Sequence, residues 1–158
     1  MASSRDRVED LIENELVTLP EDSVIADAVK VMKDGGISSI LVRSHSSSAE
    51  NPLITGIVTE RDILYRVIGG NKGPYKTVLK EVMSSPVVTI EKGSSVNEAM
   101  SLMRNKNIRR LMVIKREDSK EFTLGLVTLM SITDSLNPDK REKNYDKDQK
   151  IHRCQIRT

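Results

Sequence analysis

Two stretches of the chain carry apolar residues at the three- and four-residue spacing of an amphipathic helix. Each is preceded by serine, which favours the N-cap position, and each is followed by an apolar run of strand length. The pattern predicts helix, strand, loop, strand and helix, in this order, twice. The helical apolar positions are Val24, Ala28, Val31 and Met32 in the first stretch and Val96, Ala99, Met100 and Met103 in the second.

In each half, a short amphipathic helix is predicted to precede a β-α-β-β-α unit. Ser23 is predicted to cap the first long helix, either Ser94 or Ser95 the second, and Gly35-Gly36 to end the first. The first half comprises predicted helices at 6–14, 24–33 and 59–68 and strands at 16–19, 37–43 and 53–58. The second comprises predicted helices at 77–83, 96–105 and 128–136 and strands at 87–90, 108–115 and 122–127.

The two halves are sequence repeats. A shift of 71 residues aligns Val17-Thr18-Leu19 with Val88-Thr89-Ile90. A glycine phrase, Gly56-Ile57-Val58-Thr59-Glu60-Arg61-Asp62, returns after 69 residues as Gly125-Leu126-Val127-Thr128-Leu129-Met130-Ser131. The two-residue difference falls in the serine-rich loop 44–52, where an insertion is tolerated.

One unit of this size buries too little core to be stable alone, so two units are expected to pack sheet to sheet with helices outside. The predicted fold is α+β, close to α/β in its pattern, with two pseudo-symmetric β-α-β-β-α repeats in one globule. The predicted divisions are 1–70 for the first domain with its linker helix, 71–76 for a glycine-rich linker, 77–137 for the second domain and 138–158 for a basic tail.

Composition narrows the class of protein. Aromatic residues make up 3% of the chain, so the core is expected to be aliphatic and aromatic platforms for stacking bases are nearly absent. The single cysteine excludes an internal disulfide and fits a reducing compartment. No apolar run approaches the roughly 20 residues of a membrane span, and the N-terminus lacks the apolar segment of a signal peptide. We expect a cytoplasmic protein with no membrane association.

The glycine phrase places Thr59 at a strand-to-helix corner and Asp62 one turn into the helix. A helix N-terminus offers unpaired N–H groups and positive dipole, and a carboxylate beside it can accept hydrogen bonds from the two hydroxyls of a ribose. The alternative is purely structural, with Thr59 as N-cap and Asp62 completing a capping box.

Residues 6–137 resemble a tandem pair of cystathionine beta-synthase (CBS) domains, also called a Bateman module. Three stretches carry the resemblance: Val82-Met83-Ser84-Ser85-Pro86-Val87-Val88-Thr89, Asn107-Ile108-Arg109-Arg110-Leu111-Met112-Val113, and the first glycine phrase. The resemblance implies clefts between the two repeats that bind adenosyl ligands such as AMP, ADP, ATP or S-adenosylmethionine. It implies no required cofactor, a regulatory role on a partner in trans, and a homodimer formed through the exposed helices.

The resemblance implies that the first cleft has one side that binds ribose and another that holds the base and phosphate. Arg109 and Arg110 are adjacent in a predicted strand, so at most one of them should point into a given cleft. Solvated charges, or salt bridges to Asp62 or Glu60, are the alternative to a phosphate-binding role. The first side comprises Ile57, Thr59 and Asp62, and the second Val87, Val88, Ile108, Arg109, Arg110 and Met112.

The second cleft is expected to be weaker, because serine replaces the ribose carboxylate and both arginine positions are also serines. The charge-assisted hydrogen bonds would be lost, so this cleft should be empty or take an uncharged adenosine moiety. We therefore expect one competent site. The residues of the second cleft are Thr18, Ile37, Ser38, Ser39, Leu41, Thr128 and Ser131.

Other motifs point away from catalysis. His152-Arg153-Cys154 is too small a ligand set for zinc, and no nucleophile-base pair or phosphate-binding loop has a plausible spacing. We expect neither an enzyme nor a metal site. Residues 139–158 hold seven Lys or Arg against four acidic residues. A second hypothesis therefore has the CBS pair as a docking body and this tail as a contact for RNA, a ribosome or a protein partner.

Overall fold

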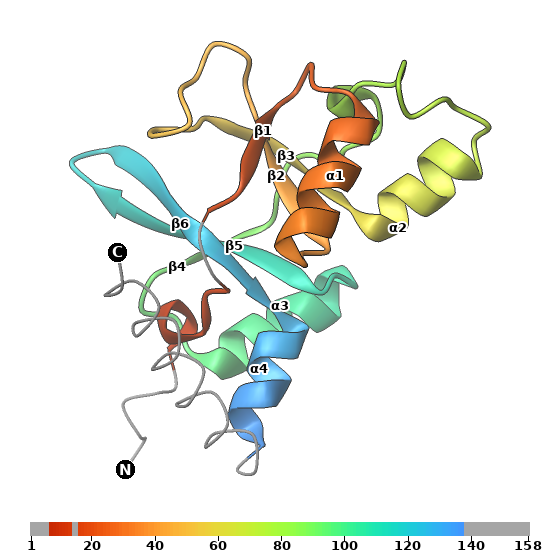
Figure 1. Ribbon diagram of the computed structural model, residues 1–158. Helices are drawn as coiled ribbons and strands as arrows, with labels where there is room; N and C mark the ends of the chain where they lie inside the picture. Colours follow the sequence, from red (N-terminus) through yellow and green to blue (C-terminus); the bar gives the residue numbers. More distant parts are fainter. Residues whose placement is uncertain (1–6, 14–15, 138–158) are drawn as a thin grey trace, which may run out of the picture.

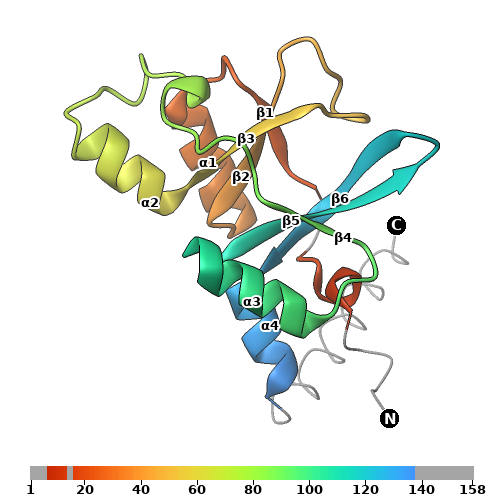
Figure 2. The same cartoon turned by 180° about the vertical axis from the view of Figure 1, so that it is seen from behind.

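The computed structural model describes residues 7–13 and 16–137. Two three-stranded sheets cross in the middle of the molecule, each with its own helices (Figures 1 and 2). The strands are β1 (Thr18–Pro20), β2 (Ser39–Arg43), β3 (Ile54–Thr59), β4 (Thr89–Glu91), β5 (Arg110–Glu117) and β6 (Lys120–Thr128). The helices are α1 (Ile25–Gly35), α2 (Glu60–Asp62) continued by the π-helical η2 (Ile63–Ile68), α3 (Val96–Lys106) and α4 (Leu129–Leu136), with 3-10 turns η1 (Val8–Leu11) and η3 (Leu79–Glu81).

The two sheets have the same topology. In each, the first strand runs parallel to the middle strand, and the middle strand is antiparallel to the last. The orders are β1-β2-β3 and β4-β5-β6. Register irregularities also match, falling between Val42 and Arg43 in one sheet and between Val113 and Ile114 in the other. The predicted α+β fold with two similar repeats is confirmed.

Three apolar clusters hold the molecule together. Each repeat has one cluster between its sheet and its helices, and a third lies where the sheets meet. At the centre of this third cluster, Leu41, Met112 and Ile114 are almost completely excluded from solvent. Removing this apolar surface from water favours association of the repeats.

The segments that precede the two repeats are exchanged between them. Val8 of η1 is fully buried in the cluster of the second repeat, with Val127 and Ile132. Leu79 and Val82, around η3, are buried in the cluster of the first repeat. Each repeat is thus completed by the segment that leads into the other one, so neither apolar core is formed by one continuous half of the chain.

The repeated glycines allow these segments to cross the last strand of each sheet. A β-carbon on Gly56 would lie 2.5 Å from Met83 Sδ and 2.9 Å from the carbonyl oxygen of Ser84. A β-carbon on Gly125, which has φ +154°, would lie 2.5 Å from Cγ2 of Ile12. Real β-carbons almost never approach other atoms this closely. The glycine at the start of each phrase is therefore required by the close approach of the crossing segment, through Met83 and the Ser84 carbonyl at Gly56 and through the Ile12 side chain at Gly125.

Some predicted elements differ from the observed ones. The predicted linker helices 6–14 and 77–83 are reduced to η1 and η3, because short helices have a high nucleation cost and the chain next extends along a strand. The predicted strand starts at 37 and 108 are two residues too early. The prediction that 59–68 is one α-helix is wrong beyond Asp62, where the hydrogen bonding becomes π-helical.

One of the predicted helix caps is wrong and two are confirmed. Ser23 does not cap α1: its N–H donates to the carbonyl of Pro20 and its own carbonyl accepts from Leu79, so Val24 takes the N-cap position. Ser95 caps α3, with Glu98 completing a capping box. Gly36 ends α1 in the left-handed region at φ +62°, as predicted from the glycine pair.

Alanine at position 56 tests the crossing. Gly56→Ala is expected to destabilise the fold by about 1–3 kcal/mol, since the added methyl must displace backbone as well as the flexible Met83 side chain. Gly73→Ala is the matched control, because nothing lies within 4 Å of its β-carbon position. Urea unfolding measures both. Equal stability of the two variants would show that the strand and segment do not approach this closely.

Candidate functional site

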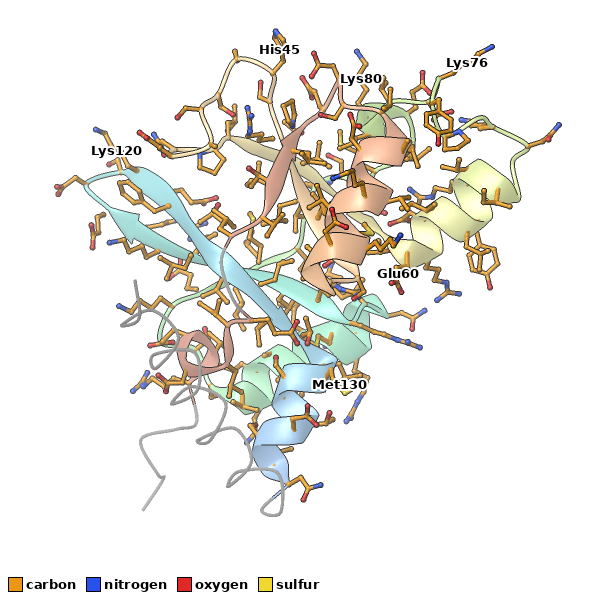
Figure 3. The ribbon with its side chains drawn as sticks, in the orientation of Figure 1. His45, Glu60, Lys76, Lys80, Lys120 and Met130 are labelled. Atoms are coloured by element: carbon orange, nitrogen blue, oxygen red, sulfur yellow. The ribbon has the colours of Figure 1, made fainter. Side chains whose placement is uncertain are left out.

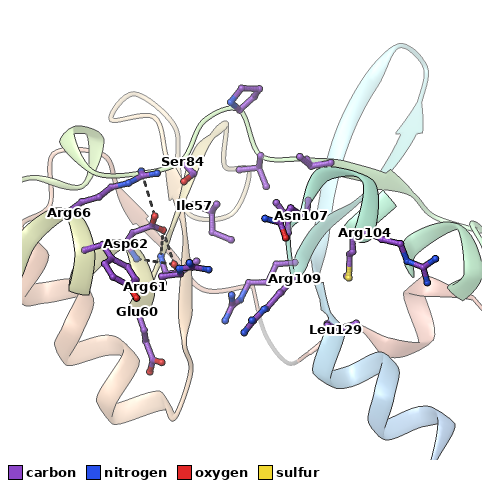
Figure 4. A pocket seen from close by; sticks show the side chains of 18 of the residues that line it. Ile57, Glu60, Arg61, Asp62, Arg66, Ser84, Arg104, Asn107, Arg109 and Leu129 are labelled. Atoms are coloured by element: carbon purple, nitrogen blue, oxygen red, sulfur yellow. Dashed lines mark hydrogen bonds and ion pairs between the residues drawn. The ribbon is translucent and has the colours of Figure 1, made fainter. Parts of the chain in front are cut away.

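A cavity of about 890 Å³ lies between the two repeats. One wall is formed by the end of β3 and the helix that follows it. The opposite wall is formed by residues 84, 86–88 and 107–110, by Met100, Met103 and Arg104 of α3, and by Leu129 at the start of α4. Figure 4 shows the two walls facing each other. The volume is within the range of small-molecule sites, which is roughly 300–1,000 Å³.

Most of the residues predicted for the first cleft line this cavity. Ile57, Thr59 and Asp62 belong to one wall, and Val87, Val88, Ile108, Arg109 and Arg110 to the other.

Met112 does not line the cavity. Its side chain is 5% exposed and packs between the two sheets with Leu41 and Ile114. Met112 was placed in the first cleft by the resemblance to the family, and alternation along β5 puts it on the same face as Arg110. Met112 lies further along the strand, however, where the second sheet already covers it. The prediction that Met112 lines the ligand site is therefore wrong, and the residue belongs to the core between the sheets.

Thr59 and Asp62 form a reciprocal capping box. Oδ2 of Asp62 accepts hydrogen bonds from the backbone N–H of Thr59 (2.9 Å) and from its hydroxyl (2.8 Å). The hydroxyl oxygen of Thr59 in turn accepts from the N–H of Asp62 (3.2 Å). The capping box that was the structural alternative to ribose binding is therefore present. It fixes the carboxylate at the cavity wall, and one of its two oxygens is used in doing so.

The other oxygen of Asp62 faces a cation. Oδ1 lies 3.5 Å from Nη1 of Arg66, one helical turn further on, and the same nitrogen donates to the carbonyl of Val82 (2.6 Å). The long ion pair is weaker than the bond to the carbonyl, so Oδ1 remains an available acceptor beside the cavity. The side chain of Asp62 is 12% exposed. It is a shielded carboxylate with one uncommitted face.

The two adjacent arginines both line the cavity, contrary to the prediction that at most one points into a cleft. The alternation rule fails because β5 begins only at Arg110, and Arg109 lies in the bend before it. The carbonyl of Arg109 accepts from the N–H of Leu129 (2.8 Å). Its exposed side chain has no hydrogen bond or ion pair within the described part of the chain.

Arg110 is held in a different way. Its Nη2 donates to the hydroxyl of Ser38 in the first repeat (2.6 Å), and its buried Nε has no partner among the described residues. Burial is the main cause that lowers the pKa of Arg110, and the nearby carboxylates of Glu13 and Glu60 oppose this effect. Neither arginine forms an ion pair with Asp62 or Glu60 within the described residues, so that sequence-based alternative is wrong.

Three further arginines of the cavity wall were missed. Arg61 lies with its guanidinium carbon 5.4 Å from the ring centre of Tyr65, and it approaches Arg109 from the opposite wall (Figure 4). Arg66 is the partner of Asp62 described above. Arg104 lines the far side. The spacing of Asp62 and Arg66, four residues apart on a helix, was the sequence signal for one of them.

None of the seven residues predicted for the second cleft lines this cavity. Ile37 packs against the core of the first repeat, and Thr18 pairs with Leu41 in the first sheet. Thr128 caps α4 with Ser131 as its capping-box partner, repeating the arrangement of Thr59 and Asp62. Ser38 is the hydrogen-bond partner of Arg110.

The second cleft is not stripped of charge, and that expectation is corrected. The hydroxyl of Thr128 donates to a carboxylate oxygen of Glu13, and Arg110 reaches Ser38 from the second repeat. Glu13 lies in the exchanged N-terminal segment, at the position that a shift of 71 residues aligns with Ser84. Comparison of the glycine phrases alone could not find it, because the carboxylate comes from a different part of the repeat.

Within the described residues, no group of three or more His, Cys, Asp or Glu side chains could hold a metal ion. No helix in the same part of the chain is long and apolar enough to cross a membrane. His152-Arg153-Cys154 and the basic tail 139–158, on which the RNA hypothesis depends, lie outside the described residues.

The chain belongs to the CBS domain family, which it matches over residues 8–69 and 79–137. An uncharacterized protein of Methanopyrus kandleri is 34% identical over 113 residues, which are 72% of this chain and 53% of that protein. The chain therefore spans about half the length of that curated relative.

Solved structures give the same fold. A CBS-domain protein of Burkholderia ambifaria superposes with a TM-score of 0.71 at 26% identity, over 85% of this chain and 96% of its own. A CBS domain protein of Pyrobaculum aerophilum, solved in complex with AMP, gives a TM-score of 0.66 at 23% identity, over 79% and 88% of the two chains. The recognition of a tandem CBS pair from its repeated motifs is confirmed.

The cap at the cavity wall can be tested directly. Thr59→Ala removes the hydroxyl that accepts from the N–H of Asp62, and is expected to cost about 0.5–2 kcal/mol of stability. Ser23→Ala is the control, because Ser23 precedes a helix in the same way but makes no cap. Its expected change is within about 0.5 kcal/mol. Urea unfolding distinguishes the two, and a larger loss in Ser23→Ala would contradict the assignment of caps.

Proposed function

We propose that the cavity between the repeats binds an adenosyl ligand, namely AMP, ADP, ATP or S-adenosylmethionine, and that its occupancy regulates a partner protein in trans. The observation that carries the proposal is that one cavity combines a fixed, shielded carboxylate, an apolar slot and several guanidinium groups. Each part matches one part of a nucleotide.

Asp62 is suited to the ribose. A ribose presents two adjacent hydroxyls, and a carboxylate accepts both through charge-assisted hydrogen bonds. The capping box fixes Asp62 before any ligand arrives, so little side-chain freedom is lost on binding. Thr59 contributes by holding Oδ2 and leaving Oδ1 toward the cavity.

Apolar residues from both walls are suited to the base. Ile57 comes from β3, Val87 and Val88 precede β4, and Ile108 precedes β5. These side chains are partly buried and belong to, or pack against, the apolar clusters, so their positions are fixed by the cores. A purine between them would remove apolar surface from water at about 25 cal/mol per Å².

Arg109 is suited to a phosphate because it is exposed and makes no ion pair within the described residues. Together, five arginines and two acidic residues line the cavity. This excess of positive charge favours the phosphorylated ligands over S-adenosylmethionine, whose sulfonium group is a cation. The P. aerophilum protein complexed with AMP supports the same ligand class.

Regulation follows from the position of the cavity between the repeats. A ligand that contacts both walls stabilises one arrangement of the repeats over others, which is a population shift. We propose that exposed apolar residues of η2 and α4 form a homodimer interface and that the regulated partner recognises the arrangement of the repeats. Met130, on the outer face of α4 in Figure 3, is one of them. The others are Leu64, Tyr65, Ile68, Leu129 and Leu136.

Replacement of the ribose carboxylate tests the ligand assignment. Asp62→Ala is expected to weaken AMP binding by about 10- to 100-fold, since hydrogen bonds to a charged group contribute about 1.5–3 kcal/mol. Ser131→Ala, at the equivalent capping position of the second repeat, is the control and should leave this affinity unchanged. Titration calorimetry measures both. Unchanged affinity in Asp62→Ala would remove Asp62 from the ribose site.

Arg109→Ala tests the phosphate without disturbing the capping box. It should weaken AMP by about tenfold or more and leave adenosine unaffected, because only AMP presents a charge to the guanidinium. Circular dichroism should show an unchanged fold, as the side chain is exposed. Equal losses for AMP and adenosine would instead indicate that Arg109 supports the shape of the cavity.

A further inference from the structure

A side-chain hydrogen bond joins the two repeats beside the cavity. Arg110 pairs with Thr128 in the sheet of the second repeat, and its Nη2 donates to the hydroxyl of Ser38 in the first repeat (2.6 Å). Because the donor carries a charge, this bond is stronger than one between neutral groups. Both residues are partly buried, so water has limited access to the contact.

Ser38 also holds the corner that carries the proposed ribose-binding residues. Its carbonyl accepts from the N–H of Glu60 (3.1 Å), which directly follows the capping residue Thr59. Thr59 in turn fixes Asp62 through the capping box. A chain of hydrogen bonds and one helix start therefore connects the guanidinium of Arg110, in one wall of the cavity, with the carboxylate in the other wall.

The same backbone contact occurs in the second repeat with a different side chain. A shift of 71 residues aligns Ser38 with Arg109, and the carbonyl of Arg109 accepts from the N–H of Leu129, the first residue of α4 (2.8 Å). The side chain of Arg109 lines the cavity and has no hydrogen bond or ion pair within the described part of the chain. One repeat thus has a hydroxyl here that receives Arg110, and the other has an unpaired guanidinium.

The two adjacent arginines are therefore suited to different tasks. In Arg110, Nη2 is bonded to Ser38 and Nε is buried without a partner among the described residues, which leaves mainly Nη1 for a ligand. Arg109 is exposed and presents its whole guanidinium, whose planar arrangement of N–H donors matches a phosphate. A phosphate in the cavity is satisfied better by Arg109.

We propose that Arg110 is a positioning residue, which through Ser38 holds the corner with Thr59 and Asp62 in place and leaves phosphate binding to Arg109. This inference rests on the proposed nucleotide function. It replaces the role of phosphate ligand that the family resemblance implied for Arg110. Ser38 does not line the cavity, so it acts on a ligand only through the groups that it contacts.

Ser38→Ala tests the proposal, because it removes the acceptor of Arg110 and leaves the cavity lining unchanged. Titration calorimetry should show AMP and adenosine weakened by a similar factor, about fivefold, which corresponds to one net hydrogen bond. The affinity for 2′,3′-dideoxy-AMP, which lacks both ribose hydroxyls, should be unchanged. An AMP affinity that is unchanged or higher would overturn the proposal, and so would an equal loss for the dideoxy ligand.

Ser101→Ala is the control, since it makes the same chemical change on an element of the cavity wall. Ser101 belongs to α3, but it is exposed, does not line the cavity and makes no hydrogen bond within the described residues. Its affinities for all three ligands should equal those of the wild type. A loss as large as that of Ser38→Ala would contradict a role specific to Ser38.

Variants of Arg110 separate positioning from phosphate contact. Arg110→Gln should weaken adenosine as much as AMP, because the glutamine is too short to hold Ser38. Arg110→Lys keeps a long, charged donor and should recover part of the loss for both ligands. A loss for AMP alone in Arg110→Gln would make Arg110 a phosphate ligand and reject the positioning role.

A measurement without ligand separates this inference from the nucleotide function. Thermal unfolding of Ser38→Ala, Arg110→Gln and the double variant gives the coupling between the two side chains. Ser38→Ala should lower the Tm of the wild type more than it lowers the Tm of Arg110→Gln. Coupling in a protein that does not bind AMP would reject only the nucleotide function. AMP binding without coupling would reject only the link between Arg110 and Ser38.

Discussion

The close crossing of each exchanged segment over the last strand of the other repeat is the contact on which the rest of the structure depends. It is possible only because Gly56 and Gly125 have no side chain. The crossing places Val8 in one core and Leu79 in the other, so the two repeats fold as one body. It also brings Ser84 and the residues after it beside the end of β3. The cavity therefore has walls from both repeats as a direct consequence of how the cores are completed.

Within this symmetric frame, the chemistry is asymmetric. The capping boxes at Thr59 and Thr128 have the same backbone geometry, but only the first contains a carboxylate. In the first cleft the acid is part of the helix cap and lies against a cavity with apolar and cationic walls. In the second, the acid is Glu13, which comes from the crossing segment. The carboxylate of the first cleft is thus fixed by a helix cap, and that of the second by the crossing segment.

The sequence was sufficient for features that repeat or that depend on local chemistry. Hydrophobic periodicity and the 71-residue shift predicted two β-α-β-β-α units, and Thr59 caps its helix as the structural alternative stated. Features set by contacts between distant segments were not predictable. Ser23 has the residue type of an N-cap, but its backbone is used by Pro20 and Leu79. Met112 was placed in the cavity by the family resemblance, but the facing sheet buries it.

The same limit explains why the second cleft was expected to be without charge. Alignment of the repeats compares each position only with its equivalent. It therefore shows that serine replaces the carboxylate in the second cap, but not that the crossing segment supplies another carboxylate to the same cleft. The pairs are Asp62 with Ser84 in one cleft and Ser131 with Glu13 in the other. Each cleft keeps one acid and one serine at these positions. Arg110 of the second repeat donates to Ser38 of the first repeat, whose carbonyl accepts from the N–H of Glu60 in the cavity wall. A cleft of this module is therefore defined by the groups that meet in space, and its charge cannot be assigned from one repeat alone.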